Sequence, residues 1–260
     1  MRSNSLTCFG VGDGWPCDNR NHSSFLYQLG KASLLIDCGE SVSRGYKNSG
    51  LSYDAVDRIF LSHLHSDHFA GLFMLMQGFW LERRQRGLPI HLPREAIKPL
   101  REMLNIAMLF EELFAFTPEY LPLKAGEPVT ARGVQVTPFA TTHLKSLQAA
   151  FQKKYKQEFE CFSFLIECEK LRLVHSADLG SPRDLDPLLE QPVDVLVCEL
   201  AHFRPRELFK YLAEKPVKRV IFIHVAREYW KKLESTRELA TRMLGGIPFH
   251  FAADGEVIEL

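Results

Sequence analysis

The chain has 260 residues, of which 46% are hydrophobic and 25% charged, a composition typical of a globular protein with a substantial core. Basic and acidic side chains number 32 each, and the resulting zero net charge argues against a strongly basic nucleic-acid-binding protein. The N-terminus shows no apolar signal-peptide core, and no stretch approaches the length of a membrane span. The six cysteines form no C-x-x-C pair, so we expect reduced, mostly buried thiols in a cytoplasmic protein without membrane association.

Short apolar runs of strand-like composition, separated by glycine and proline, dominate the first half of the chain. They lie at Leu6–Phe9, Ser24–Leu29, Ser33–Ile36 and Arg58–Leu61. Apolar residues at helical spacing then predict a helix from Ala70 to Arg86. A second helix is predicted from Arg94 to Phe114, with Pro99 as a candidate kink near its start.

The second half of the chain repeats this order of strands and helices. Its strand-like runs lie at Val134–Phe139, Cys161–Cys168, Leu171–Val174, Val193–Cys198, Val220–Ile223 and Phe249–Ala252. Helices are predicted at Arg183–Glu190, Pro205–Glu214 and Lys231–Leu244. Two such halves predict an α/β (α+β) fold in which two sheets pack face to face with helices outside. Because no repeat, low-complexity segment or linker interrupts the chain, we expect one domain spanning residues 1–260.

A dense cluster of candidate metal ligands follows the apolar run Arg58–Leu61. It contains His63, His65, Asp67 and His68 within six residues. Because side chains alternate faces in an extended segment, His63 and His65 point the same way and can share one ion. Asp67 and His68 come after the chain turns and can reach a second ion. Imidazole and carboxylate without thiolate suit Zn, Mn or Fe in a reactive site better than a closed structural zinc site.

Further polar residues stand where other apolar runs end. They are Asp37, His143, Asp178 and His224. Functional residues gather at such positions when the loops that follow several strands cluster on one edge of a sheet. These four residues are therefore candidates to complete the site begun by the histidine cluster.

This ordered set resembles the five motifs of the metallo-β-lactamase superfamily, and the resemblance runs from about Leu6 to Ala226. It implies a four-layered αββα sandwich with two divalent metal ions, most readily Zn, with Mn or Fe as alternatives. Three histidines would hold one ion, two histidines and an aspartate the other, and a second aspartate would bridge them. The first ion would be held by His63, His65 and His143, and the second by Asp67, His68 and His224. The bridging aspartate would be Asp178.

Two acidic residues are candidates for supporting the ligands. The resemblance implies that Asp37 orients the histidine loop through hydrogen bonds, a role whose loss weakens metal binding. Glu199 ends an apolar run, and it is either a second supporting residue of this kind or a charge at the start of a helix.

Within the superfamily, the N-terminal half is most similar to the ribonuclease Z branch. The similarity rests on Cys8–Gly12, Arg20–Ser24, Leu34–Glu40 and Ser62–Leu72. That branch carries a long flexible arm that grips tRNA between its third and fourth motifs. Only 35 residues separate His143 from Asp178 here, and no Gly/Pro-rich arm fits between them.

The segment 145–158 is predicted to be a short helix in place of that arm. It carries Lys145, Lys153, Lys154 and Lys156, which form either a solvated helix face or an attractor for a phosphate group, with Lys145 as the candidate substrate contact. The chain also lacks the branch's His-Ser-Thr motif between Cys198 and His224. Both departures disfavour tRNA as the substrate and favour an armless phosphodiesterase.

Three residues are candidates for moving protons during hydrolysis. Asp67 can accept a proton from the nucleophile, as the resemblance implies. His202, in Glu199–Phe203, and His22, in the loop of residues 19–23, are the alternatives for protonating the leaving group.

Three functions remain open on the sequence alone. The favoured one is hydrolysis of a small or nucleotide phosphodiester, cyclic or linear, with a ribonuclease Z-type cut at a tRNA 3′ end as the alternative. Hydrolysis of a lactone, thioester or β-lactam shares the same metal core, and fold analogy does not separate it from the first. A metal-binding protein without turnover is disfavoured by the complete ligand set. Related proteins are often dimers, so a homodimer is one candidate assembly, which the sequence does not decide.

Overall fold

The computed structural model describes residues 4–169 and 171–260. The chain divides into two compact units, each built on one sheet. The first unit comprises residues up to Leu123, Ala131–Gly133 and Ala253–Leu260. The second comprises Lys124–Thr130 and Val134–Ala252. The expectation that residues 1–260 form a single domain stays a prediction.

The first unit contains a seven-stranded mixed sheet in the order β14-β1-β2-β3-β4-β5-β6. Its strands are β1 Ser5–Gly10, β2 Ser24–Leu29, β3 Ala32–Ile36, β4 Arg58–Phe60, β5 Leu88–Leu92, β6 Pro118–Pro122 and β14 Val257–Glu259. The strands from β3 to β6 are all parallel to one another, whereas β14, β1, β2 and β3 pair antiparallel. The carboxyl ends of β3 and β4 therefore meet at one edge, where binding sites of parallel sheets form.

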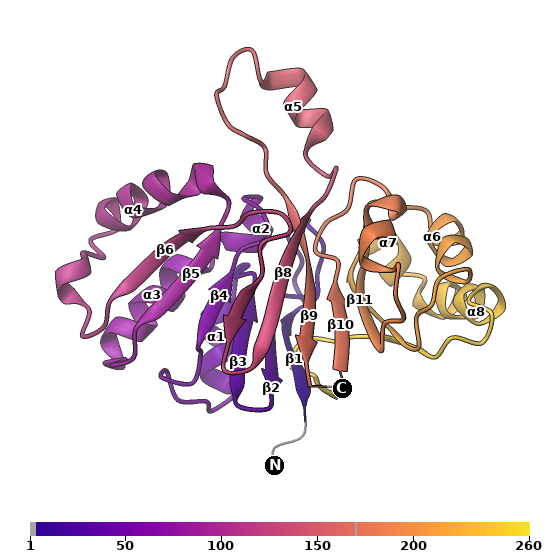
Figure 1. The fold of residues 1–260 in the computed structure, drawn as a ribbon, viewed down its shortest axis with the longest axis horizontal. Coiled ribbons are helices and arrows are strands. Elements are labelled where there is room, and N and C mark those ends of the chain that lie inside the picture. Colours follow the sequence, from indigo (N-terminus) through magenta and orange to yellow (C-terminus); the bar gives the residue numbers. More distant parts are fainter. Residues whose placement is uncertain (1–3, 170) are drawn as a thin grey trace. The chain divides into compact units, whose positions relative to one another are not determined.

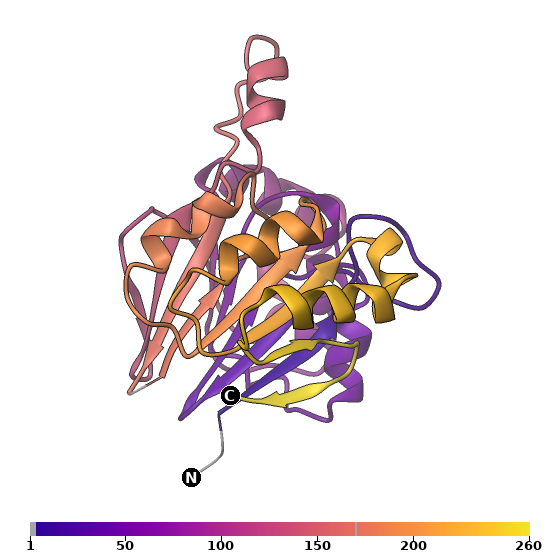
Figure 2. The same ribbon diagram turned by 90° about the vertical axis from the view of Figure 1, so that its right-hand side faces the viewer.

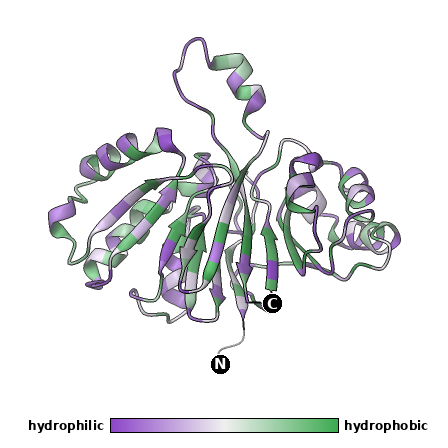
Figure 3. Cartoon of the chain, in the orientation of Figure 1, coloured by the Kyte–Doolittle hydropathy of each residue, from purple (hydrophilic) through white to green (hydrophobic). Residues whose placement is uncertain are grey.

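Helices cover one face of this sheet with apolar side chains. They are α1 Val42–Asn48, α3 Leu72–Leu81 and α4 Ile97–Ile106. Tyr46 of α1 and Phe79 of α3 are fully buried and meet with ring centroids 6.2 Å apart. They belong to one cluster with Leu35 and Ile59 of the sheet, so burial of this apolar stripe holds the helices in place. Figure 3 shows hydrophobic and hydrophilic stretches alternating along α4, as expected for a helix with one buried side.

The second unit contains a sheet in the order β13-β12-β11-β10-β9-β8-β7. Its strands are β7 Val129–Ala131, β8 Val134–Ala140, β9 Phe162–Cys168, β10 Leu171–His175, β11 Val195–Leu200, β12 Val220–Val225 and β13 Phe249–Phe251. The strands from β10 to β13 are parallel, and β9 runs antiparallel to both β8 and β10. The carboxyl ends of β8, β10, β11 and β12 consequently share one edge.

Helical segments of the second unit bury their apolar sides against this sheet. They are η3 Pro182–Leu188, α6 Pro205–Leu212, α7 Arg227–Trp230 and α8 Leu233–Met243. Phe209 of α6 meets Phe222 of β12 with ring centroids 5.3 Å apart, and both rings are fully buried. Ser181 and Asp184 form a capping box that starts η3.

The short helix α5, Lys145–Phe151, projects away from the ends of β8 and β9, as Figures 1 and 2 both show. None of its residues is buried. The predicted helix over 145–158 was therefore too long, because the segment after Phe151 turns and does not continue the helix. A helix of seven residues without a buried face is stabilised by few contacts.

Two helices end earlier than the periodicity predicted, and both end in the same way. The helix predicted to Arg86 stops at Leu81, and Arg83 adopts a left-handed φ of 55°. The helix predicted to Phe114 divides into the 3₁₀ turn Arg94–Ala96, α4 and the 3₁₀ turn Glu111–Leu113. Met108 ends α4 with a left-handed φ of 59°, and the Leu109 N–H donates back to the Leu104 carbonyl. Such left-handed C-terminal caps usually carry glycine, so neither end is visible in the sequence pattern.

Sequence patterns missed several elements of the first unit, among them β5, β6, β14 and α1. β5 and β6 contain Pro89, Pro118 and Pro122, which obscure the strand pattern, and α1 is only seven residues long. Pro99 lies in the first turn of α4, where a helix tolerates proline.

Two expectations drawn from composition concerned the burial of the cysteines and the lack of a membrane-spanning segment. Five of the six cysteines are buried and Cys17 is half-buried, which confirms mostly buried thiols. Among the described residues, no helix combines the length and the hydropathy that crossing a membrane requires.

Candidate metal centre

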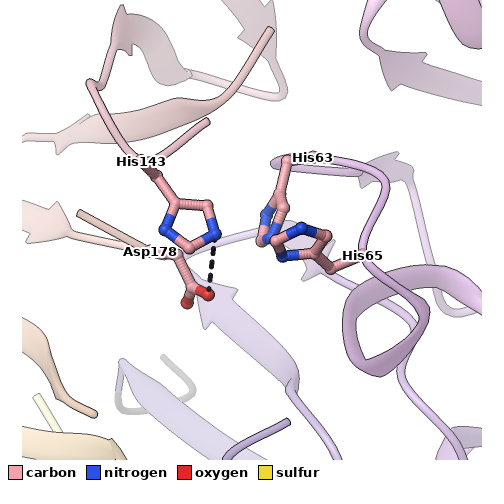
Figure 4. A group of neighbouring side chains, drawn as sticks. All are labelled: His63, His65, His143 and Asp178. Carbon is pink, nitrogen blue, oxygen red and sulfur yellow. Dashed lines mark ion pairs between the residues drawn. The ribbon is translucent and has the colours of Figure 1, made fainter. Parts of the chain in front are cut away.

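The histidine cluster occupies the turn that follows β4 in the first unit. His63 and His65 lie in the connection, whereas Asp67 and His68 belong to the short helix α2, Ser66–Phe69. The ring of His63 lies 4.7 Å from that of His65 and 4.2 Å from that of His68, measured between centroids. The first two imidazoles lie side by side in Figure 4. Three imidazoles and a carboxylate thus gather within one turn of chain.

Asp37 connects this turn to the end of β3. Its Oδ1 accepts a hydrogen bond from the Ser62 N–H at 2.7 Å. Its Oδ2 accepts from the Ser62 hydroxyl at 2.9 Å and from His68 Nδ1 at 2.7 Å. Asp37 is fully buried, and its own N–H donates to the Phe60 carbonyl of β4. These bonds tie the first residues after β4 to the neighbouring parallel strand.

The same bonds determine which ring nitrogens carry protons. Because the Ser62 hydroxyl donates its proton to Asp37, its oxygen is left to accept from His63 Nδ1 at 3.0 Å. The carboxylate of Asp37 likewise accepts from Nδ1 of His68. In both rings Nε2 is then the nitrogen with a lone pair, which is the form of histidine that binds metal ions. Ser62 orients His63 only because its hydroxyl lies between Asp37 and His63 in the fold. No feature of the sequence singled out this serine.

A buried thiol stands beside Asp37 without adding to the ligands. Burial raises the pKa of the Cys38 thiol well above its usual range, and the negative charge of Asp37 raises it further. Among the described residues, Cys38 belongs to none of the groups of donor atoms close enough together to share an ion. The candidate donors of this unit are imidazole and carboxylate groups.

The second unit brings its candidate ligands together at the carboxyl ends of its strands. His143 follows β8, Asp178 follows β10, and His224 lies near the end of β12. His143 Nε2 lies 3.6 Å from Asp178 Oδ2, the ion pair drawn in Figure 4, and His224 Nε2 lies 3.7 Å from Oδ1 of the same carboxylate. Asp178 thus presents one oxygen to each of two histidines.

His202 joins this group through Glu199. The buried carboxylate of Glu199 accepts from His202 Nδ1 at 2.8 Å and from the backbone N–H groups of Leu179, Ala201 and His202 at 3.0, 2.7 and 3.1 Å. His202 Nε2 lies 3.8 Å from Asp178 Oδ2, and its ring centroid is 4.6 Å from that of His143. Glu199 therefore fixes both the loop carrying Asp178 and the orientation of His202.

The donor set of the second unit also fits a metal ion. Asp178, His202 and His224 each offer an atom within 4.8 Å of the others. About one third of the His202 side chain is exposed, whereas those of Asp178 and His224 are almost fully buried. Two imidazoles and a carboxylate at such short separations have the composition of a metal site.

Strained backbone marks three of these strand ends. Asp37, Ala177 and His224 have φ values of 59°, 45° and 46°, in the left-handed region that non-glycine residues rarely occupy. The register of β11 and β12 also shifts between Glu199 and Leu200. Such strain costs on the order of 1–3 kcal/mol per residue and concentrates at functional sites, where it aims side chains in fixed directions.

Two glycines allow the backbone to approach the histidine cluster closely. A Cβ at Gly39 would lie 2.3 Å from the Asp67 carbonyl oxygen, and one at Gly71 would lie 2.0 Å from the Gly39 carbonyl oxygen. Any larger residue at either position would push α2 away from the end of β3. The glycines in Cys38-Gly39 and Ala70-Gly71 are thus needed for packing around Asp67.

The two candidate substrate contacts lie in different surroundings. His22 is buried, with Nδ1 3.5 Å from Glu40 Oε2, and it packs against Gly39. Lys145 begins α5 and is exposed, two residues after His143. Their roles toward a substrate stay predictions.

Replacing Asp37 by asparagine is expected to lower the apparent metal affinity about 10- to 100-fold, the usual cost of losing a partner that orients a ligand. Asparagine tolerates the left-handed φ, so the loss reports on the hydrogen bonds to Ser62 and His68. Competition with a fluorescent chelator measures the affinity.

Asp57→Asn is the matched control for that change. Asp57 is also a nearly buried carboxylate, and it accepts from the Ser33 N–H, Arg132 and Arg86, away from the cluster. Both variants are expected to lose about 1–3 kcal/mol of stability. Equal metal affinity in the two variants would contradict the role of Asp37.

A family described as "Anti-Pycsar protein Apyc1" matches residues 4–236 of the chain. Ribonuclease Z from Archaeoglobus fulgidus is 33% identical over 140 residues, which make up 54% of this chain and 44% of that relative. The chain spans half or less of the length of the curated relatives it matches. These matches agree with the predicted similarity to ribonuclease Z.

Solved structures identify the fold class. YhfI from Bacillus subtilis, a metallo-β-lactamase fold protein, superposes with a TM-score of 0.78 at 21% identity, covering 99% of this chain and 100% of that one. Unliganded yeast PDE1 superposes with a TM-score of 0.72 at 13% identity, covering 100% of both chains. The predicted αββα metallo-β-lactamase class is therefore confirmed. The chain belongs to the Anti-Pycsar protein Apyc1 family, is similar in sequence to ribonuclease Z, and has the metallo-β-lactamase fold.

Proposed function

We propose that this protein is a metal-dependent hydrolase that cleaves a small or nucleotide phosphodiester. The observation that carries the proposal is the pair of hydrogen-bonded ligand sets at strand ends. In one set Asp37 and Ser62 direct the lone pairs of His63 and His68, and in the other Glu199 orients His202 beside Asp178. Proteins orient ligands in this way where a metal ion is held for chemistry.

We assign two divalent ions, Zn first and Mn or Fe as alternatives, to seven ligands. One ion is assigned His63, His65 and His143, the other Asp67, His68 and His224, and Asp178 is assigned to both. Superfamily membership and the donor chemistry support this assignment. Bound ions of this kind lower the pKa of water toward ~7 and counter the charge on phosphate oxygens.

His202 is the proposed general acid for the leaving group. Its Nδ1 donates to the buried Glu199 carboxylate, which stabilises a protonated imidazole and aims Nε2 toward Asp178. A proton held on Nε2 can then pass to the departing oxygen. Asp67 is the proposed acceptor for the proton of the nucleophile. His22 is the alternative donor, and its burial makes it the weaker candidate.

The relatives support a phosphodiester substrate. Ribonuclease Z of Archaeoglobus fulgidus and yeast PDE1 bear names that denote phosphodiester cleavage. The first of them favours a second candidate function, cleavage at a tRNA 3′ end. The lysine-bearing segment that starts at Lys145 is exposed and projects from β8 and β9, and a phosphate of either substrate is its proposed contact.

A substrate panel at saturating Zn or Mn tests the proposal. We expect turnover of bis(p-nitrophenyl) phosphate and of 3′,5′-cyclic and linear nucleotide diesters, without hydrolysis of a lactone, a thioester or a β-lactam. Matched reactions with a 3′-extended pre-tRNA separate the two phosphodiester candidates. Hydrolysis confined to the lactone, thioester or β-lactam would discard the proposal. Light scattering on the same sample tests the candidate homodimer.

A further inference from the structure

An exposed tryptophan lies beside the histidine cluster in the first unit. Trp15 is 57% exposed and sits in the connection from β1 to β2. Its neighbour Gly14 approaches Asp67 so closely that a Cβ at this glycine would lie 3.2 Å from Oδ2 of the carboxylate. Standard backbone dimensions then place the Trp15 Cα within about 9 Å of that oxygen.

The connection that carries Trp15 is held at both ends by hydrogen bonds. The Gly12 N–H donates to the Asn21 carbonyl at 2.8 Å, which closes the loop at its base. Asp254 accepts from the Val11 N–H at 2.9 Å and from the Asn21 N–H at 2.5 Å. Asn21 Nδ2 donates to the Phe9 carbonyl at 2.9 Å. The loop is thus fixed at its base, three residues before Trp15, and this anchoring lowers the entropic cost of ordering the loop around a ligand.

Close packing at this base requires small residues. A Cβ at Gly10 would lie 1.9 Å from the His22 carbonyl oxygen, and one at Gly12 would lie 2.9 Å from the Asn21 carbonyl oxygen. The two glycines therefore let the outgoing and returning strands of the loop touch. The position of Trp15 relative to Asp67 follows from this packing within one unit.

We propose that Trp15 determines substrate specificity by stacking on the base of a nucleotide phosphodiester whose phosphate lies at Asp67. The inference rests on the proposed function and deepens it, because it names the residue that would recognise the base of a nucleotide substrate. A base and its phosphate are separated by one ribose, a span that fits an indole one residue away from Gly14, where an added Cβ would meet the Asp67 carboxylate. Stacking on an aromatic face tolerates every base, so the contact selects nucleotides without selecting one base.

Two esters with the same leaving group test the proposal. The p-nitrophenyl ester of thymidine 5′-monophosphate carries a base, and methyl p-nitrophenyl phosphate does not. Trp15→Ala is expected to lower kcat/KM for the thymidine ester about 5- to 150-fold, mainly through KM, and to leave the methyl ester unchanged. Trp15→Phe keeps an aromatic face and is expected to retain most of the activity. Trp15→Leu keeps an apolar side chain without that face and is expected to behave as the alanine variant does.

A second readout does not depend on turnover. Thymidine 5′-monophosphate is expected to quench the tryptophan fluorescence of the wild-type protein and not that of Trp15→Phe, which retains Trp80 and Trp230. Leu81→Ala, which truncates another exposed apolar side chain of the same unit, is the control. It is expected to leave kcat/KM unchanged for both esters.

The outcomes separate this inference from the proposed function. If the wild-type protein hydrolyses neither ester, the proposed function is wrong. If it hydrolyses both and Trp15→Ala lowers both equally, or Trp15→Leu matches the wild type, the stacking role of Trp15 is overturned while the hydrolase stands. A change in molar mass on replacing Trp15 would likewise overturn it, because the indole would then serve an interface between copies.

Discussion

The purified protein is expected to hold close to two transition-metal ions per chain, and replacing His63 and Asp178 together by alanine is expected to abolish that binding. The His63→Ala change removes the imidazole whose Nδ1 is hydrogen-bonded to Ser62. The Asp178→Ala change removes the carboxylate that faces both His143 and His224. Removing a supporting partner costs 10- to 100-fold in affinity, so removing two ligands is expected to cost well over ~100-fold.

Elemental analysis after reconstitution with Zn and with Mn measures the metal content, and circular dichroism checks that the variant is folded. The control is a double variant with one substitution in each unit at residues outside the assigned ligands, His91→Ala with Asp194→Ala. His91 is buried against Phe60, and Asp194 pairs with Lys218. Retention of both ions by His63→Ala/Asp178→Ala, or a metal-free wild-type protein after reconstitution, would refute the assigned centre.

Replacing His202 by alanine is expected to slow hydrolysis of a diester with an alkoxide leaving group about 10²- to 10⁴-fold, the usual contribution of a general acid. Hydrolysis of a p-nitrophenyl ester is expected to change little, because p-nitrophenolate departs without a proton.

The metal content of the variant separates two roles of this residue. His202 Nε2 lies 3.8 Å from Asp178 Oδ2, and His202, Asp178 and His224 each offer a donor atom within 4.8 Å of the others. A ligand role therefore predicts loss of metal from His202→Ala. A proton-donor role predicts unchanged metal content. His22→Ala is the matched comparison, and a larger, leaving-group-dependent loss in that variant would transfer the role to His22. Glu199→Gln keeps an acceptor for His202 Nδ1, and the weaker charge is expected to give an intermediate rate.

Strands with uninterrupted apolar runs were predictable because their signal is local. The expected Ser24–Leu29 run matches β2 at both ends, and Arg58–Leu61 matches β4 to within one residue. β5 was not predictable from its own residues, because Pro89 breaks its pattern and pairing with β4 and β6 supplies the strand conformation. The early ends of α3 and α4 at left-handed arginine and methionine residues also come from their surroundings.

Part of the candidate site could likewise be predicted from local sequence patterns, and part could not. The ligand spacing from His63 to His68, and the order of Asp37, His143, Asp178 and His224, were readable from the sequence because metal-binding motifs are short and lie at strand ends. The hydrogen bonds that direct those ligands were not, because they join residues distant in the chain. Asp37 reaches Ser62 across two parallel strands.

The sequence by itself determined the metallo-β-lactamase fold class, the similarity to ribonuclease Z and the chemical types of the candidate ligands, because all three depend on residue identity and local spacing. Only the tertiary structure decided which nitrogens of His63 and His68 face away from Asp37 and Ser62, and that one Glu199 carboxylate receives four donors. It also brought Gly14, and with it Trp15, beside Asp67. These features depend on the meeting of loops after separate strands, which no local pattern encodes.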